Sequence, residues 1–371
     1  IVRASFVMAE DEVRSPYFYL LKHLLIMGVG GLFFFLCYWV DYHRWRDILV
    51  PIILVIIAML VYVLGFGTAV NGAKRWIYIG SFSVQPAEFA KICSVMIEAY
   101  YLSYCIQKRQ AFKLIQSQHG TLVVLAALVE LEPDMGTMMI ILGVPLLMLI
   151  VAGLDMGKIK NLIFIVVAAA TALCIYQPYR LQRIKVMLDP WADAQGMGYQ
   201  TVQSITAIGS GGFWGMGLGE GLAKYAYLPE AHTDFAFAVF CQENGFLLAA
   251  GLIILYGLLG YFGAKIAKNA YDAYGQVLAG GLVILICLQA VINMFMVSGF
   301  LPVIGVPLPF ISYGGCSLLV SMAALGILVN INRYSLIKQR KMEKLTEHNL
   351  ANRQKPMRLM PGQRPKLTRI K

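Results

Sequence analysis

Long apolar runs alternate with short polar connections along most of this chain, and that pattern predicts its architecture. Runs such as ILVPIILVIIAMLVYVLGFG and GLVILICLQAVINMFMVSG hold eighteen or more residues almost without charge. A helix of about 20 apolar residues crosses the roughly 30 Å hydrocarbon core of a membrane. The pattern predicts nine spanning helices, at residues 17–40, 49–67, 87–105, 118–132, 135–153, 160–177, 235–264, 276–300 and 312–333.

Composition supports an all-α polytopic membrane protein. Of the 371 residues, 59% are hydrophobic and 14% are charged, whereas a soluble domain carries about 25% charged residues. The chain divides into a transmembrane domain, residues 1–333, with one long polar interruption at 178–234, and a basic tail, residues 334–371. The tail is rich in Pro, Gln and Asn, which predicts disorder.

Lysine and arginine counts predict the orientation of the helices. From Arg333 onward there are twelve Lys/Arg against two Glu, which places the C-terminus in the cytoplasm and the segment 178–234 outside. Apart from the tail, the predicted inner loops hold nine Lys/Arg and the outer segments eight. The usual inside bias is therefore nearly absent. Either the predicted topology is wrong, or the outer face has a reason to be cationic, and an anionic lipid substrate would be such a reason.

Three outer segments carry candidate ligands for such a substrate. In KRWIYIGSFSVQPAEFAK, Arg75 and Lys91 form a candidate phosphate clamp, although an interfacial belt and a local Glu88–Lys91 ion pair explain the same residues. Where the segment 178–234 begins, three further cations cluster: Arg180, Arg183 and Lys185. The glycine-rich GSGGFWGMGLGEG of that segment offers backbone N–H groups to an anion or sugar, or is simply a flexible loop.

Two other stretches interrupt the apolar pattern. Glu130, Glu132 and Asp134 surround Pro133 between two apolar runs, and pairing with outer cations is the favoured explanation of this polar break. GFLPVIGVPLPFISYGG holds too many Pro and Gly residues for one regular helix. It predicts a partly re-entrant loop that shapes a cavity.

Asp234 stands where LPEAHTD meets the apolar run that follows. Thr233 or Asp234 is a candidate helix cap. Alternatively Asp234 is a general base, with His232 and Glu230 as competitors, and the residues alone do not decide among the three. Seven scattered cysteines and five histidines form no metal or disulfide pattern.

Six motifs, KRWI…QPAEFAK, EPDMGT, LDPWAD…GYQ, AIGSGG, LPEAHTDFAFAV and GVPLPFISYGG, together resemble the SEDS family (shape, elongation, division and sporulation), the FtsW/RodA/SpoVE proteins. They occur in family order along essentially the whole chain, and DPWAD and PLPFISYGG are closest to the cell-division branch.

The resemblance implies ten helices and a peptidoglycan glycosyltransferase of the bacterial cytoplasmic membrane, working at the division septum. It implies lipid II (a disaccharide–peptide on undecaprenyl diphosphate) as substrate, and a class B penicillin-binding protein and other divisome proteins as partners. Asp234 would deprotonate the acceptor hydroxyl, while outer cations would stabilise the leaving diphosphate. No cofactor is implied with certainty, although a divalent cation is compatible with the chemistry.

The chain departs from the family in two ways. Its first residues resemble the end of the family's first helix, so we expect most of that helix to be missing from this sequence. Gln242–Glu243–Asn244–Gly245 stands where the family often has Glu-Glu-Leu-Gly, so one of two acids is absent. A lipid II transporter and a non-catalytic septal scaffold are the alternatives to a polymerase.

Overall fold

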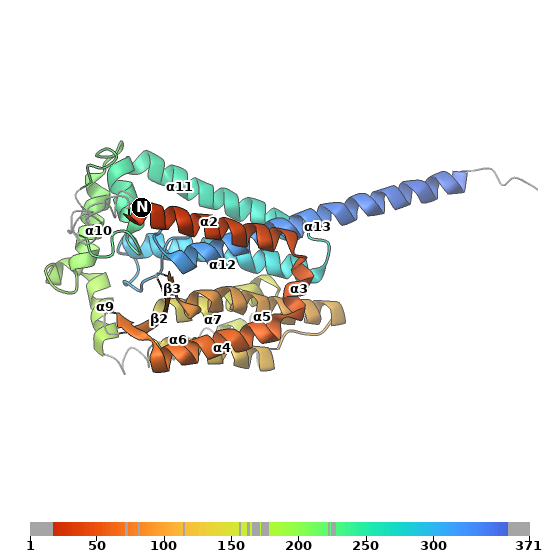
Figure 1. The fold of residues 1–371 in the computed structure, drawn as a ribbon, viewed down its shortest axis with the longest axis horizontal. Helices are drawn as coiled ribbons and strands as arrows, with labels where there is room; N and C mark the ends of the chain where they lie inside the picture. Colours follow the sequence, from red (N-terminus) through yellow and green to blue (C-terminus); the bar gives the residue numbers. More distant parts are fainter. Residues whose placement is uncertain are drawn as a thin grey trace, which may run out of the picture.

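The computed structural model describes residues 18–354 apart from 71–72, 81, 114–115, 156, 162–163, 165–170, 172–177, 222 and 224–227. These residues form a bundle of long helices with a smaller lobe at one end, while the C-terminal helix projects from the other end (Figure 1). We call the first the loop end, because it holds the strands and the segment 178–234. We call the second the tail end.

Helices occupy eight of the nine predicted spans, and the ninth, 160–177, lies largely outside the described residues. The long helices are α2 (Phe18–Trp39), α4 (Leu49–Phe66), α5 (Pro86–Lys108), α6 (Ser117–Leu131), α7 (Met135–Val151), α11 (Ala236–Lys268), α12 (Ala273–Val297) and α13 (Gly315–Gln354). Six of them are long and apolar enough to cross a membrane, and α6 and α7 are shorter apolar helices. The all-α polytopic fold is thereby confirmed.

Short elements connect the long helices. They are α3 (Tyr42–Asp47), α9 (Pro178–Leu188), the 3-10 helix η1 (Pro190–Asp193), α10 (Tyr199–Ser210), and the strands β1 (Thr68–Val70), β2 (Ala73–Ile79) and β3 (Phe82–Val84). The strands form an antiparallel sheet in the order β1-β2-β3, with Ile77 opposite Val84. The hydropathy pattern does not predict this sheet, since three short strands leave no long alternating run.

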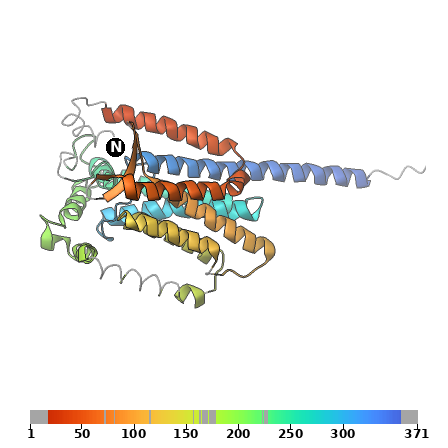
Figure 2. The same cartoon turned by 60° about the horizontal axis from the view of Figure 1, so that its bottom comes forward.

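The helix α13 is longer than the hydropathy pattern predicts. The apolar run ends near residue 333, where we expected a disordered tail to begin. The helix instead continues to Gln354 and extends well beyond the bundle (Figure 2). Residues such as Lys, Arg, Gln and Glu are good helix formers, so polarity alone does not end a helix.

Helix α12 lies at the centre of the bundle, in contact with α5, α7, α11 and α13. The main apolar core draws on α4, α5, α6, α7, α12 and α13. A second, smaller core at the loop end contains Phe235 and Val239 of the α11 start together with Met296 and Leu308. The two cores meet at α12, so this helix connects the bundle to the loop end.

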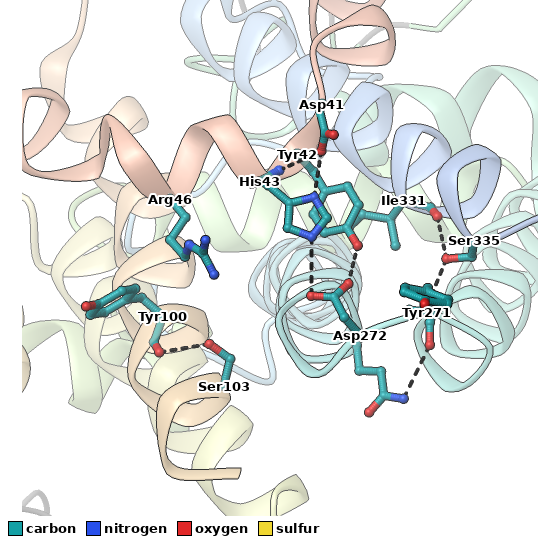
Figure 3. A network of polar contacts seen from close by, with 12 residues as sticks. Asp41, Tyr42, His43, Arg46, Tyr100, Ser103, Tyr271, Asp272, Ile331 and Ser335 are labelled. Atoms are coloured by element: carbon teal, nitrogen blue, oxygen red, sulfur yellow. Dashed lines mark hydrogen bonds and ion pairs between the residues drawn. The ribbon is translucent and has the colours of Figure 1, made fainter. Parts of the chain in front are cut away.

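A polar network closes the tail end (Figure 3). The Tyr42 hydroxyl donates to Asp272 in the turn between α11 and α12, and the His43 ring lies 2.7 Å from Asp41 and 3.5 Å from Asp272. The Tyr271 amide donates to Ser335 of α13 at 3.0 Å. These contacts tie α3, the α11–α12 turn and α13 together at the end opposite Asp234.

Candidate functional site

Asp234 lies in the turn that ends the segment 178–234 and leads into α11. The helix begins at Ala236 after Phe235, and no side chain forms the cap hydrogen bond. The cap interpretation of Asp234 is therefore wrong, and its carboxylate is not used to start the helix. Its Oδ2 atom faces Gly305, because a Cβ placed on that glycine would lie only 3.4 Å from it.

The surroundings of Asp234 raise its pKa toward neutral pH. Although part of the residue is accessible, desolvation by the protein raises the pKa of Asp234 to about 7, and the carboxylates of Glu230 and Asp134 add to the rise. Arg75 acts in the opposite direction. A carboxyl group that is half ionised near pH 7 is well suited to accept and release a proton there.

The two competing bases have other contacts. Glu230 is exposed, and its Oε2 accepts a hydrogen bond from the Thr233 hydroxyl at 2.7 Å. The backbone carbonyl of His232 accepts a hydrogen bond from the Tyr313 amide at 2.8 Å, and their rings lie 5.8 Å apart. Both residues therefore support the turn around Asp234.

Arg75 of β2 holds the turn between α6 and α7. Its Nε donates to the carbonyl of Glu132 at 2.9 Å, and its Nη2 donates to the carbonyl of Pro133. Asp134 caps α7, since its carboxylate accepts from the Thr137 amide at 3.1 Å and hydroxyl at 3.0 Å. The predicted polar break is thus a helix start held by an arginine. The expected ion pairing with outer cations is wrong for Glu132 and Asp134, because Arg75 binds backbone carbonyls and not these carboxylates.

Glu132 is the unusual member of this turn. It is buried, and neither carboxylate oxygen has a hydrogen-bond partner among the described residues. Burial raises the pKa of Glu132 to about 8, and the Asp134 carboxylate adds to the rise while Arg75 opposes it. Glu132 is therefore largely protonated at neutral pH, which avoids an unpaired buried charge.

Lys91 and Glu88 are buried together inside the bundle. Lys91 is 1% exposed, and its Nζ lies 2.8 Å from Glu88 Oε1 and 3.2 Å from Gln289 Oε1. The local ion pair that the sequence offered as the plain explanation is present. The phosphate clamp with Lys91 is not formed, because its ammonium points at protein partners away from the surface.

One of the three cations of α9, Arg183, lines a surface cavity. Arg183 donates through Nη1 to the carbonyl of Val303, and Lys185 is exposed. Arg180 belongs to α9, but its side chain lies outside the described residues. A cavity of about 400 Å³ lies between α9, α10 and residues 301–303, and it is lined by Arg183, Met187, Tyr199, Gln200, Thr201 and Pro229 among others.

The segment 301–314 is not helical, as its Pro and Gly content predicted. It covers the start of α7 so closely that a Cβ on Gly136 would lie 2.4 Å from the Ile304 carbonyl oxygen. Val306 and Leu308 are buried, and the Tyr256 hydroxyl donates to Pro309. The segment thus forms one wall beside Asp234.

The glycine-rich segment is bound to α11, so it is neither a free loop nor an anion cradle. The helix is broken at Gly245, which has φ 71° and ψ −176°. Met216 and Gly217 donate their amides to the carbonyls of Gln242 and Glu243 at 3.0 and 3.1 Å, and Phe246 donates to the Gly212 carbonyl at 2.9 Å. These backbone groups are therefore used inside the protein.

Sequence reasoning missed two amides of α12, Gln289 and Asn293. Both are buried, and both contact the site. Two amides four residues apart inside the apolar run GLVILICLQAVINMFMVSG were the available signal. Within the described part of the chain, no group of three His, Cys, Asp or Glu side chains could hold a metal ion.

Fold and site define a multi-pass helical membrane protein with an acid-centred polar site at one end of the bundle. The sequence matches the family described as "Cell cycle protein" (FTSW_RODA_SPOVE) over residues 1–337. The chain belongs to this family.

Named relatives cover nearly the same length. "Stage V sporulation protein E" of Bacillus subtilis is 36% identical over 338 residues, 90% of this chain and 92% of the relative. "Probable peptidoglycan glycosyltransferase FtsW" of Trichlorobacter lovleyi is 39% identical, and the match covers 90% of this chain and 88% of the relative. Its counterpart in a Geobacter species is 38% identical, covering 90% and 91%.

Two solved structures share the fold. A chain of a peptidoglycan synthase complex superposes with a TM-score of 0.73 at 24% identity, covering 90% of this chain and 95% of that chain. The rod shape determining protein RodA of Thermus thermophilus gives a TM-score of 0.61 at 25% identity, covering 90% and 93%.

Proposed function

We propose that this protein is a peptidoglycan glycosyltransferase that polymerises lipid II at the outer face of the cytoplasmic membrane, with Asp234 as the general base. The observation that carries the proposal is the match to relatives of that name over nine tenths of the chain. The position of Asp234 supports it. The carboxylate does not cap α11, the residue is partly accessible, and its pKa is about 7.

In the proposed reaction Asp234 accepts the proton of the acceptor sugar hydroxyl. The hydroxyl oxygen forms a bond to the anomeric carbon of the donor, and the bond from that carbon to the diphosphate breaks. Negative charge then grows on the undecaprenyl diphosphate. Positive charge near the loop end, from Arg75, Arg183 and Lys185, favours this step electrostatically, and the cavity beside α9 offers space for a sugar unit.

The proposal extends to the location and partners of the protein. The segment 178–234 would face outward and the C-terminus the cytoplasm, as the charge of the tail predicts. One structural relative is part of a peptidoglycan synthase complex. We therefore propose a class B penicillin-binding protein as partner, with other divisome proteins, at the division septum.

The test is glycan synthesis from lipid II by the purified protein in lipid, with chain lengths measured on gels. Asp234→Asn should lower the rate by about 100- to 10,000-fold, because a positioned general base contributes about that much. Asp155→Asn is the matched control, since Asp155 is an exposed acid outside the site. We expect this control to keep the wild-type rate.

Two results would count against the proposal in different ways. Wild-type polymerisation by Asp234→Asn would remove Asp234 as the base while leaving the enzyme intact. Wild-type protein that makes no glycan, but carries labelled lipid II across proteoliposome membranes, would replace the polymerase with a transporter.

A further inference from the structure

Helix α12 carries two amide side chains, Gln289 and Asn293, four residues apart on one face. Gln289 is 4% exposed and Asn293 is fully buried, although the helix around them is apolar. Residues four apart lie one above the other on a helix, so both amides point the same way. Buried amides inside a spanning helix are costly unless they are bonded.

Asn293 joins two segments that approach α12 from different parts of the chain. Its Nδ2 donates to the backbone carbonyl of Asp234 at 2.8 Å and to that of Val306 at 2.7 Å. One side chain therefore uses both N–H bonds of its amide to hold the turn of Asp234 and the segment 301–314 at the same point.

Gln289 makes the corresponding connection one turn deeper. Its Nε2 donates to the carbonyl of Pro307 at 3.0 Å, and its Oε1 accepts from Lys91 at 3.2 Å. Lys91 is in turn paired with Glu88 at 2.8 Å. The two amides thus link the ion pair of α5, the segment 301–314 and the turn of Asp234.

This linkage fixes where the carboxylate of Asp234 lies. Its Oδ2 faces Gly305, and Gly305 directly precedes Val306, which Asn293 holds. The position of the acid relative to the wall beside it is therefore set by the Asn293 side chain together with the bond from the Tyr313 amide to the His232 carbonyl. A misplacement of about 1 Å in an active site can cost about 100-fold in rate.

We propose that Asn293 and Gln289 are positioning residues, which hold Asp234 and the segment 301–314 in a fixed relation so that the carboxylate keeps its catalytic orientation. The inference rests on the proposed role of Asp234 as base. Neither amide reaches the reacting atoms; both act through the backbone they bind.

The chain offers a matched control at its opposite end. Asn330 of α13 is also buried, accepts from the Tyr42 amide at 3.0 Å and donates to the Tyr38 carbonyl at 2.6 Å. It therefore makes the same kind of bonds to backbone groups as Asn293, but next to the tail-end network. Replacing either residue removes one buried amide, and only one of them adjoins Asp234.

The experiment compares Asn293→Leu with Asn330→Leu in full-length protein in lipid, with kcat and KM for lipid II polymerisation and thermal stability measured for each. We expect both to lose stability. Asn293→Leu should also lose about 100-fold in kcat with KM changed less than about threefold. Asn330→Leu should keep kcat within about threefold.

A double variant tests whether Asn293 acts through Asp234. Asp234→Asn with Asn293→Leu should be no slower than Asp234→Asn alone, because the residue to be positioned is already lost. If Asn293→Leu fails to fold, Gln289→Met carries the same comparison, since Met keeps the length of the side chain without its hydrogen bonds, and we expect kcat to fall about tenfold.

The inference is overturned if Asn293→Leu keeps its kcat or loses no more than Asn330→Leu, or if the double variant multiplies the two losses. If Asn293→Leu does not fold, a wild-type kcat in Gln289→Met overturns it. A fully active Asp234→Asn would instead remove the proposed base itself, and that result is read from the single variant before the others are compared.

Discussion

Asp234 owes its raised pKa to neighbours from separate parts of the sequence. Burial is the largest cause, followed by Glu230 in the same turn and Asp134 at the start of α7, while Arg75 of β2 opposes them. A base must be ionised to accept a proton, so a raised pKa moves the onset of activity toward higher pH. The balance of these charges should therefore appear in the pH profile.

We expect the acid limb of the pH profile, where the polymerisation rate rises with pH, to have its midpoint at a pH of about 7. Below that pH the rate should fall about tenfold per unit, because only the ionised fraction of Asp234 is active. Initial rates between about pH 5 and 9 with lipid II well below its KM measure this limb, because kcat/KM reports the pKa of the enzyme without substrate. A limb near the ordinary Asp value of about 4 would contradict the burial of the carboxylate.

Glu230→Gln should shift this acid limb to lower pH. The substitution removes a nearby negative charge, so the ionised form of Asp234 becomes easier to reach and its pKa falls. Glu343→Gln, an exposed acid on the projecting part of α13, is the control and should leave the limb in place. An unchanged limb in Glu230→Gln would show that Glu230 does not act on Asp234.

The sequence located part of this site and missed part of it. Asp234, Glu132 and Asp134 stood out because acids beside apolar runs are rare. The burial of Lys91 could not be predicted, since its pairing with Gln289 depends on how α12 packs on α5. Asn293 was missed for the same reason: its partners lie 59 and 13 residues away.

At the scale of elements, the glycine-rich segment and the break in α11 form one structure. A Cβ on Gly245 would lie 2.2 Å from the Gly215 amide nitrogen, and a Cβ on Gly215 would lie 2.2 Å from the Glu243 carbonyl oxygen. Both residues also have positive φ. The composition indicated a special backbone, but only the fold reveals the partner, because the two segments are about 30 residues apart.

Gly245→Ala should destabilise the protein by more than about 2 kcal/mol, since the new methyl group meets backbone atoms and the φ is strained. Gly251→Ala is the control in the same helix, where a Cβ meets nothing within 4 Å. Thermal unfolding in detergent should show a lower midpoint for the first variant and little change for the second. Equal midpoints would contradict the close contact at Gly245.

At the scale of the whole molecule, the hydropathy pattern predicted the bundle well because each spanning helix is a local signal. The strands β1–β3 and the extension of α13 were not predicted, since neither depends on apolar periodicity. The orientation of the bundle in the membrane stays a prediction from the charge of the tail.

Cysteine labelling tests that orientation. Lys185→Cys, on exposed α9, should react with a membrane-impermeant maleimide in intact cells. Lys344→Cys, on the exposed projecting part of α13, should react only after the membrane is opened. The six described cysteines are free, and only Cys287 among them is not buried. A variant with Cys287→Ser and Cys174→Ser supplies the background, since Cys174 lies outside the described residues. The reverse labelling pattern would invert the proposed topology.

The bond between Asn293 and Asp234 also sets a depth. Asn293 lies four residues before the end of α12, which is about 6 Å along a helix. The acid therefore stands about one helical turn before the loop end of α12, not beyond it. In the proposed function this depth suits a sugar carried on a membrane-embedded prenyl chain better than a water-soluble sugar nucleotide, which would have to descend from the solvent.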